Sequence, residues 1–310
     1  MSWIKVFAPA TIGNIGPGFD VLGLAVKGMG DTVMARKIES GLKISAVNGK
    51  HELSADPEKN TVTLAAKEVL KTIDVEGGIE FKLYKGMPVG SGLGSSAASA
   101  AAGAFAANEL FGRPLSKNEL IFPATKAEEI VSGGFFADNT APATLGGATL
   151  TRTMEPLDVT RIGSIHSLKI VLVTPDVVIL TKDAREMLPQ KVVMDDFVAN
   201  MANTALITAA FSKDDYSLFA RSLNDCVIEP VRCKLIKGFK EVKQAALEAG
   251  ADGMTISGSG PTVFAITNDE GKADWIRNRM VNTFRDIGIA SDSLITEVDD
   301  EGTRLVERDE

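Results

Sequence analysis

The sequence predicts an α+β protein built from two domains. Its 310 residues exceed the length at which one hydrophobic core usually keeps growing. Segments with the period of strands and segments with the period of helices occur in both halves. They do not alternate in the strand–helix–strand repeat of a doubly wound sheet, which favours α+β over α/β. Residues 152–167 are polar and lack a long periodic pattern, so we expect domains at 1–160 and 161–310.

The first half is predicted to hold strands and helices around two glycine-rich segments. Alternating or β-prone runs predict the strands Trp3–Ala8, Val21–Val26, Thr32–Ile38, Leu42–Val47 and Ile79–Tyr84. Helical spacing or alanine content predicts the helices Thr61–Ile73, Leu93–Leu110 and Ser116–Val131. Ser116 and Glu119 form a capping-box pattern at the start of the last helix, and Gly133 ends it. Glycine, proline and Asx content predicts a loop over Asn14–Phe19 and a turn over Asp138–Pro142.

The second half is predicted to open with a buried strand and to continue mainly as helices. Apolar runs predict the strands Leu168–Val173, Gly253–Ile256, Thr262–Ile266 and Leu294–Val298. Apolar spacing predicts the helices Lys182–Leu188, Asp195–Phe211, Asp215–Leu223, Cys233–Ala249 and Lys272–Phe284.

Composition excludes several classes of function. The net charge is -8, and no cluster of lysine and arginine breaks this acidic background, so we expect no nucleic-acid partner and no membrane attachment. The first residues lack the pattern of a signal peptide. Cys226 and Cys233 form no CxxC pair, which is typical of free thiols in a cytoplasmic protein. Only two histidines occur, which disfavours a histidine metal site or a Ser-His-Asp triad.

The strongest functional signal is the glycine- and serine-rich run at residues 88–98. It follows a predicted strand and opens a helix, whose free N–H groups and positive dipole end would face the loop. Gly90, Gly92 and Gly94 alternate, which lets the backbone approach a bulky anion. Three glycines in five positions, followed by Ser95 and Ser96, exceed what a simple turn requires. The segment therefore predicts a site for a polyphosphate such as ATP.

Two common phosphate loops are excluded by the residues themselves. A Walker A loop needs Gly-Lys-Ser/Thr, and no lysine lies between Gly90 and Ala98. A dinucleotide fingerprint needs a third glycine at the position of Ser95. These exclusions disfavour a P-loop enzyme and a dehydrogenase.

The run at 88–98 resembles the phosphate loop of the GHMP kinases, which include the galactokinases, homoserine kinases and mevalonate kinases. Further segments resemble homoserine kinase segments in order and spacing: Ala8–Thr11 with Asn14 and Gly16–Asp20, Asp138–Pro142 with Leu145–Gly147, Thr181–Arg185 to Pro189, Glu229–Arg232 and Thr255–Thr262. The resemblance covers nearly the whole chain. It implies an N-terminal half like a ribosomal protein S5 domain 2-type fold, a C-terminal half like a ferredoxin-like sandwich, and nucleotide between them.

The resemblance also implies a reaction. ATP would phosphorylate the hydroxyl of L-homoserine, giving O-phospho-L-homoserine on the route to threonine. Ser96 and Glu128 would hold Mg2+, and a hydroxyl with a carboxylate suits this hard cation. The residues that would bind ATP are Pro88, Val89, Gly90, Ser91, Gly92, Leu93, Gly94, Ser95, Ser96, Ala97 and Ala98.

Four residues match the family positions that bind the two charged groups of the substrate. Arg185 and Arg232 would bind its carboxylate, because the guanidinium fork matches a carboxylate. Asn14 and Asp20 would hold its ammonium group. Taken without the family, the arginines would be surface residues and the other two would be turn residues.

The reacting hydroxyl is expected to lie at the middle segment. By resemblance Asn139 would orient the hydroxyl, and Asp138 would hold Asn139 or act as a base; both are also typical of an Asx turn. Homoserine kinases are thought to work without a side-chain base, so we expect alignment and charge stabilisation to dominate. Gly258, Ser259 and Gly260 form a second glycine turn that would close over the phosphates or the substrate, or serve only as a hairpin turn.

Two residues depart from the family pattern. Phe136 stands where many homoserine kinases carry a histidine, which removes a polar contact and keeps a different alcohol substrate open. Gly13 stands where alanine is usual, a change that we expect to be harmless by volume. A non-catalytic nucleotide-binding protein is the other alternative, and the family resemblance is compatible with a homodimer.

Overall fold

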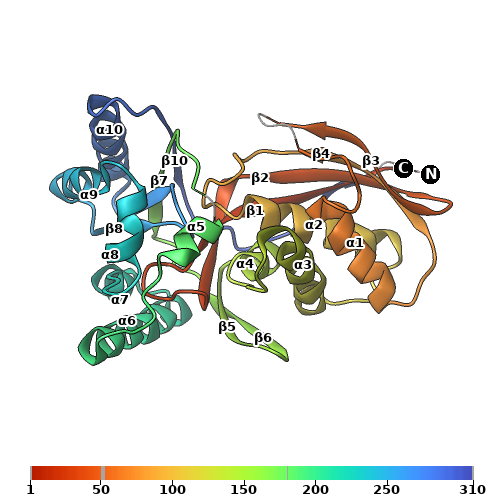
Figure 1. Ribbon diagram of the computed structural model, residues 1–310, viewed down its shortest axis with the longest axis horizontal. Coiled ribbons are helices and arrows are strands. Elements are labelled where there is room, and N and C mark those ends of the chain that lie inside the picture. The colour runs from red at the N-terminus through yellow and green to blue at the C-terminus, as the bar shows by residue number, and fades with distance from the viewer. Residues whose placement is uncertain (1, 50–52, 180, 309–310) are drawn as a thin grey trace.

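Two β-sheets organise the chain. The computed structural model describes residues 2–49, 53–179 and 181–308 (Figure 1). The described strands form a seven-stranded sheet and a four-stranded sheet. In Figure 1 the N-terminal elements lie on the right and most C-terminal elements lie on the left, while both chain ends meet on the right.

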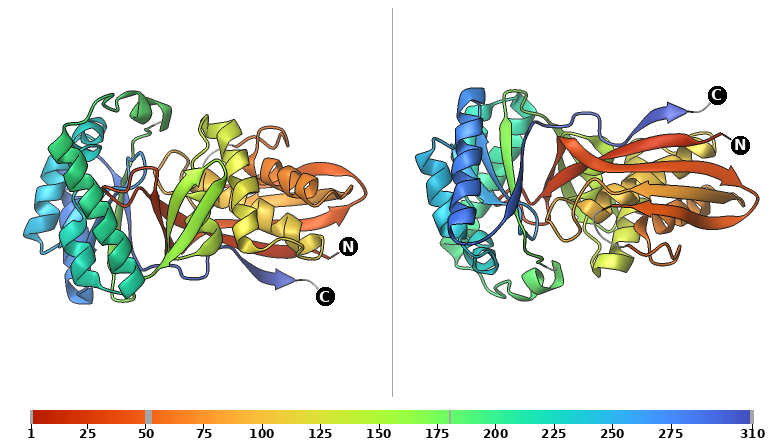
Figure 2. Two further views of the ribbon diagram at one scale, coloured as in Figure 1. Left: turned by 90° about the horizontal axis from the view of Figure 1, so that it is seen from below. Right: turned by 90° about the horizontal axis from the view of Figure 1, so that it is seen from above.

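The larger sheet is built mainly from the first half of the chain. Its order is β11-β1-β2-β4-β3, with β5 paired to β2 and β6 paired to β5. The strands are β1 (Ile4–Gly13), β2 (Leu22–Ile38), β3 (Gly41–Asn48), β4 (Gly78–Tyr84), β5 (Ala148–Met154), β6 (Leu157–Gly163) and β11 (Arg304–Arg308). The last strand returns from the end of the chain to pair with β1, and Figure 2 shows it beside the N-terminus.

Helices cover one face of this sheet. They are α1 (Thr61–Thr72), α2 (Ser95–Leu110), α3 (Lys117–Ser132) and α4 (Thr140–Leu145). The parallel strands β3 and β4 are joined through α1, as parallel neighbours require a crossover. The capping box predicted for Ser116 and Glu119 is present, and Gly133 ends α3 at φ 78.

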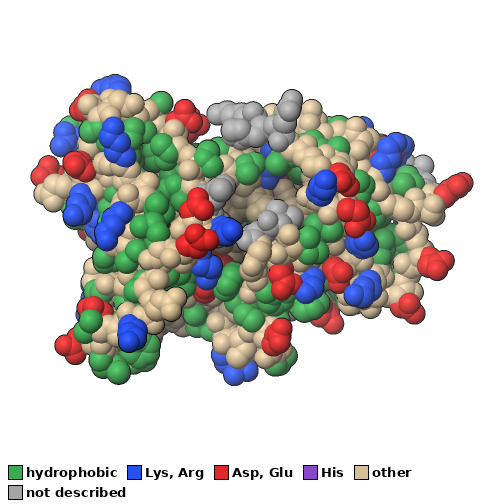
Figure 3. Space-filling view, in the orientation of Figure 1, with side chains coloured by type: hydrophobic (Ala, Val, Ile, Leu, Met, Phe, Trp, Pro, Cys, Tyr) green, Lys and Arg blue, Asp and Glu red, His purple; other side chains and the backbone are tan. Residues whose placement is uncertain are grey.

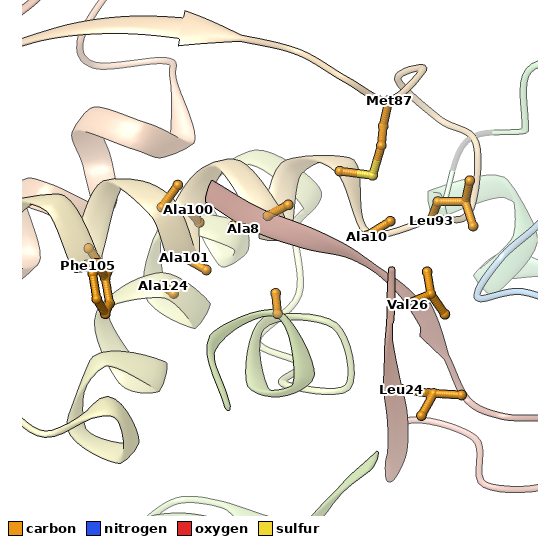
Figure 4. Close-up of a cluster of buried hydrophobic side chains, with 14 of the residues drawn as sticks. Ala8, Ala10, Leu24, Val26, Met87, Leu93, Ala100, Ala101, Phe105 and Ala124 are labelled. Carbon is orange, nitrogen blue, oxygen red and sulfur yellow. The ribbon is translucent and has the colours of Figure 1, made fainter. Parts of the chain in front are cut away.

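The alanine-rich helix α2 lies at the centre of the larger core. Ala100 and Ala101 lie close to Ala8 of β1 and to Ala124 of α3 (Figure 4). Small side chains on both sides allow the backbones to approach closely, and the backbone of Val62 in α1 occupies the space that a Cβ of Gly103 would need. This packing holds the N-terminus of α2 firmly where the glycine-rich loop joins it.

The smaller sheet has the order β10-β7-β9-β8, with every neighbouring pair antiparallel. Its strands are β7 (Lys169–Pro175), β8 (Gly253–Ile256), β9 (Val263–Thr267) and β10 (Ser291–Thr296). The helices of this half are α5 (Thr181–Glu186), α6 (Met194–Lys213), α7 (Tyr216–Ser222), α8 (Glu229–Arg232), α9 (Phe239–Glu248) and α10 (Glu270–Asp286). Counted by strand, the order is 4-1-3-2 with helices between strands 1 and 2 and between 3 and 4. This arrangement confirms the expected ferredoxin-like half.

Strand alternation divides the smaller sheet between two cores. Val171 and Val173 point to the face covered by α9 and α10, whereas Ile170, Leu172 and Phe264 join the core of the first half. The core of the first half therefore extends onto one face of the smaller sheet. This shared packing fixes the position of the groups that lie between the two sheets.

Several predicted elements differ from the structure. Val21–Val26 and Thr32–Ile38 were predicted as separate strands, but β2 runs through both because a bulge opposite Pro9 and Ala10 absorbs the extra residues. Within the turn predicted over Asp138–Pro142, Asp138 and Asn139 do form a turn, but α4 begins at Thr140. No strand was predicted over β6 or β11. Both segments contain many polar residues, and their side chains are at most partly buried. The helix expected over Cys233–Ala249 is interrupted, and α9 begins only after Gly238 at φ 81.

The change from the larger to the smaller sheet falls between Gly163 and Lys169, while β11 belongs to the larger sheet. The division at residues 160/161 stays a prediction. Within the described residues, no helix combines the length and the apolar character needed to cross a bilayer.

Candidate active site

The glycine-rich loop adopts a backbone that only glycine enters easily. Gly90, Gly92 and Gly94 have φ angles of 68°, 80° and 64°, and Gly94 is the residue directly before α2. All three lie in the left-handed region, where a Cβ is strained. The alternation of glycine in the sequence is therefore a conformational requirement, and it directs the loop to the N-terminus of a 16-residue helix.

Neighbouring strands and the second glycine turn hold the loop in place. The backbone N–H of Thr11 donates to Leu93 O (3.0 Å), and that of Thr262 donates to Ser91 O (3.1 Å). Ser257 Oγ donates to Gly92 O (2.6 Å). A side chain on Gly92 would collide with this turn, whose Ser257 and Gly260 carbonyls lie within 2.8 Å of the Cβ position. The two glycine segments therefore act as one packed unit.

A cleft of about 680 Å³ lies over the loop, between the two halves. Figure 3 shows the molecule hollowed at this position, with acidic and basic side chains at the edge of the hollow. The cleft brings together most of the residues predicted for the site: Asn14, Asp20, Val89, Gly90, Ser91, Gly92, Gly94, Ser95, Ser96, Ala97, Glu128, Asp138, Asn139, Arg185, Arg232, Gly258 and Ser259. Four predicted residues do not line it, namely Pro88, Leu93, Ala98 and Gly260.

Ser96 and Glu128 meet at the end of the cleft nearest the helix. Ser96 lies in the first turn of α2 and Glu128 in the last turns of α3, and Ser96 Oγ donates to Glu128 Oε2 at 2.9 Å. Burial raises the pKa of the Glu128 carboxyl to about 7, against the opposing effects of the Ser96 hydrogen bond and the Lys85 charge. A cation bound here would restore the charged form of this carboxylate.

Asp138 and Asn139 are fixed at the start of α4. Thr11 Oγ1 donates to Asn139 Oδ1 (2.8 Å), and Asn139 Nδ2 donates to Asp138 Oδ2 (3.2 Å). Burial raises the pKa of Asp138 to about 7, and the Asp20 charge adds to the increase, while Arg185 and the Asn139 hydrogen bond oppose it. The Asn139 amide is thereby oriented with its oxygen toward β1.

Gly13 leaves room for two side chains of the site. A Cβ at this position would lie 2.5 Å from Asp138 Oδ2 and 2.7 Å from Asn139 Nδ2. The space next to β1 is filled by these two side chains, so an alanine here would require them to shift. Their positions therefore depend on the missing methyl group of residue 13.

The opposite end of the cleft carries the two arginines. Arg185 donates through both Nη atoms to the Asp20 carboxylate, at 3.0 and 2.9 Å. Asn14 ties the neighbouring loops, because its Nδ2 donates to Gly258 O (2.9 Å) and its Oδ1 accepts from the Asp20 N–H (3.0 Å). The residues predicted to meet the substrate are thus partly engaged with one another.

Arg232 is the more buried of the two arginines. Its Nη1 donates to Gly258 O at 3.0 Å and its Nε lies 3.4 Å from Ala184 O. It forms no ion pair within the described ranges of the chain. Burial, together with the Arg185 charge, lowers its pKa. A buried guanidinium whose hydrogen bonds in the described residues go only to backbone carbonyls is suited to bind an anion.

The sequence did not predict a buried charge cluster beneath the loop. Lys85 forms an ion pair with Asp31, and its Nζ donates to Ser95 O (2.7 Å) and Ser99 Oγ (3.0 Å). Burial lowers the pKa of Lys85, against the effect of Asp31. The available signal was a lysine directly between a strand and the glycine-rich loop. The sequence could not identify Asp31 as the partner of Lys85, because the two meet only through the pairing register of β2 and β4.

Family models match both halves of the chain. The model of the GHMP kinases N terminal domain matches residues 60–147, and that of the GHMP kinases C terminal domain matches residues 207–286. These ranges include the glycine-rich loop, α3 and α4 in the first half and the second glycine turn in the other.

Full-length relatives agree with the family models. The homoserine kinase of Chlorobium phaeobacteroides (strain DSM 266) is 40% identical over 99% of this chain and 100% of its own length. The homoserine kinase of Arabidopsis thaliana is 44% identical over 98% of this chain and 84% of its own length. The crystal structure of homoserine kinase from Cytophaga hutchinsonii aligns with a TM-score of 0.93 and 42% identity, covering 98% of this chain and 97% of the other. The chain belongs to the GHMP kinase family, and within it to the homoserine kinases.

Proposed function

We propose that this chain transfers the γ-phosphoryl group of ATP to the hydroxyl of L-homoserine, giving O-phospho-L-homoserine for threonine synthesis. The observation that carries the proposal is one cleft with two kinds of lining. A glycine-rich loop at a helix N-terminus lines one part, and two guanidinium groups with Asp20 line the other. Such a cleft can hold a polyphosphate and a zwitterionic amino acid side by side.

ATP would place its phosphates on the loop amides of Gly92, Gly94, Ser95 and Ser96. The left-handed glycines keep side chains away from the phosphates, and the N-terminal end of α2 favours their negative charge. Apolar, amide and hydroxyl side chains also line the cleft and offer a surface for the base: Leu53, Asn60, Thr61 and Leu83.

Mg2+ would be held by Ser96 and Glu128. Their oxygens lie 2.9 Å apart in the structure, which suits two neighbouring ligands of a hard cation. Among the described residues no group of three or more His, Cys, Asp or Glu residues is placed to hold a metal. Two protein ligands agree with a cation that takes its remaining ligands from phosphate and water. The ion would supply charge neutralisation at the transferring phosphoryl group.

L-Homoserine would lie between the arginines and Asn139. Arg185 and Arg232 would bind its carboxylate, while Asp20 and Asn14 would hold its ammonium group. Asp20 is paired with Arg185 and also lines the cleft, so its carboxylate can contact both the guanidinium and an ammonium group. The fixed amide of Asn139 would then orient the hydroxyl toward the phosphate loop.

Asp138 and Asn139 would act mainly by alignment. Phosphoryl transfer depends on positioning and charge stabilisation more than on covalent chemistry. We therefore expect Asp138→Ala and Asn139→Ala to reduce kcat partially, with substrate binding retained. Complete loss of activity in Asp138→Ala, with intact homoserine binding, would instead assign Asp138 as a general base, a role for which a pKa of about 7 is suitable.

A coupled ADP-release assay with ATP, Mg2+ and a panel of alcohols tests the function. We expect turnover with L-homoserine and little with mevalonate or shikimate. Turnover of another alcohol but not of homoserine would make the chain a GHMP kinase of different specificity. ATP binding without ADP release for any alcohol would make it a non-catalytic nucleotide-binding protein. Leaving out Mg2+ should abolish turnover, and Ser96→Ala should raise the Mg2+ concentration needed.

The predictions of a cytoplasmic homodimer also belong to this proposal. The free thiols of Cys226 and Cys233 support a reducing compartment. The exposed side of α6 carries Phe197, Val198 and Met201 and has no charged residue between Asp196 and Lys213, so two copies could pair without charge repulsion. Light scattering of the wild type and of Met201→Glu should show a dimer and a monomer; a monomeric wild type contradicts this part.

A further inference from the structure

Arg185 is held from two directions in the cleft. The Asp20 carboxylate binds its two Nη atoms at 3.0 and 2.9 Å. The ring of Phe136 lies against the guanidinium, with 3.9 Å from Arg185 Cζ to the ring centroid. A second ring, Phe19, lies farther away at 5.4 Å. Phe136 is therefore the aromatic side chain in stacking contact with this arginine.

The carboxylate and the ring restrict different motions of the guanidinium. A two-pronged contact with Asp20 fixes the distance and direction of Arg185, but it leaves the guanidinium plane free to tilt about the line through its two donating nitrogens. A ring against the face of the guanidinium removes that remaining freedom. The ring face also carries negative electrostatic potential, which favours the cation at this position.

The fixed plane matters because Arg185 has donors left for another group. Arginine carries five N–H donors, and Asp20 takes two of them. No acceptor in the described part of the chain takes the other three. Arg185 and Arg232 line the same cleft, and of the two only Arg185 forms an ion pair in the described residues, with Asp20. The remaining donors of Arg185 are therefore directed to an incoming anion, and their direction depends on the guanidinium plane.

We propose that Phe136 is a positioning residue that sets the plane of Arg185 and thereby determines the affinity for the carboxylate of the amino-acid substrate. The inference rests on the proposed function, because it takes L-homoserine as that substrate. It also changes the meaning of the aromatic residue at 136. The ring does not merely leave out a polar contact with the substrate; it acts through the arginine.

Steady-state kinetics with L-homoserine and ATP test the proposal in five proteins. They are the wild type, Phe136→Leu, Phe136→Tyr, a protein with 3,4,5-trifluorophenylalanine at position 136 only, and the control Phe135→Leu. Phe135 lies in the same loop, but its ring contacts Phe122 (5.8 Å between centroids) and it does not line the cleft. Trifluorination keeps the ring and its size nearly unchanged but weakens its negative face.

We expect Phe136→Leu to raise the KM for homoserine about 3- to 20-fold, a range that matches one exposed to partly buried cation–π contact. The KM for ATP and kcat should stay within about twofold. The trifluorinated protein should show an intermediate increase, whereas Phe136→Tyr and Phe135→Leu should stay near the wild type. Thermal unfolding of each protein shows that it is folded.

Three results would overturn the inference while leaving the proposed function intact. They are an unchanged KM for homoserine in the trifluorinated protein, an equal increase in Phe136→Tyr and Phe136→Leu, or a parallel increase in the KM for ATP. If Phe136→Leu does not fold, the trifluorinated protein decides the question. If the wild type releases no ADP with homoserine, the proposed function fails and the inference is overturned with it.

Discussion

The buried carboxyl of Asp138 should make the stability of this protein depend on pH in a defined direction. Burial next to Asp20 raises its pKa from the ordinary 3.8 to about 7. The folded protein therefore holds this proton more tightly than the unfolded chain. As the pH rises from about 4 to 7, the unfolded chain releases this proton while the folded protein keeps it, so the free energy of unfolding falls. Above about pH 8 both states have released it, and the loss stays constant.

The substitution Asp138→Asn removes this cost. A difference of about three pH units corresponds to roughly 4 kcal/mol at full ionisation. The amide keeps the shape of the side chain and can still accept from Asn139, but its NH2 group needs a partner, so we expect a net gain of about 2–4 kcal/mol at pH 8.5. At pH 4 the ionisation cost is absent, so the same partner cost should leave no gain or a loss of up to about 2 kcal/mol. Urea unfolding of both proteins at pH 4, 6, 7 and 8.5, without nucleotide or substrate, measures the difference.

The matched control is Asp183→Asn on the exposed surface of α5. It makes the same chemical change without burial, and it should give no pH-dependent gain. A gain in Asp138→Asn that is equal at pH 4 and pH 8.5 would refute the reasoning, because it would not come from ionisation. A loss of stability that grows with pH would show that the charged form of Asp138 is the stabilising one.

Two further substitutions test the loop and the charge cluster beneath it. Gly94→Ala should raise the KM for ATP more than about tenfold, because a Cβ there would overlap Thr11 Oγ1 and the φ of 64° is strained for alanine. The control is Gly112→Ala, which also has a positive φ but no atom within 4 Å of the Cβ position. It should leave the KM for ATP unchanged. Lys85→Met should lower the free energy of unfolding by about 3–5 kcal/mol, because Asp31 would be left buried and uncompensated, and urea unfolding should show most of this loss recovered in Lys85→Met/Asp31→Asn.

The sequence predicts the parts of the site that depend on local backbone requirements. Alternating glycines before a helix specify the phosphate loop, because each of Gly90, Gly92 and Gly94 adopts a left-handed conformation. The capping box at Ser116 likewise predicts the start of α3 from residues that contact one another locally. In these segments the backbone conformation depends on residues only a few positions apart in the sequence.

The sequence did not predict the contacts between segments that are far apart in the chain. Lys85 meets Asp31 only because β2 and β4 pair in one register. The return of β11 to the first sheet depends on an edge left open beside β1, and no pattern within Arg304–Arg308 predicts it. The bulge that joins the two halves of β2 depends on the partner strand β1, so the sequence predicted two separate strands instead of one.

Gly13 and Phe136 show why a departure from a family pattern cannot be judged at its own position. Each was first assessed by what the residue itself lacks, a methyl group in one case and a polar group in the other. In the structure the space beside Gly13 is taken by Asp138 and Asn139, and the face of Phe136 is taken by Arg185. The charge of Arg185 in turn lowers the pKa of Asp138. Residues 13 and 136 therefore both contact side chains of one group of interacting charges. Reverting either residue alone would therefore disturb an arrangement that depends on both.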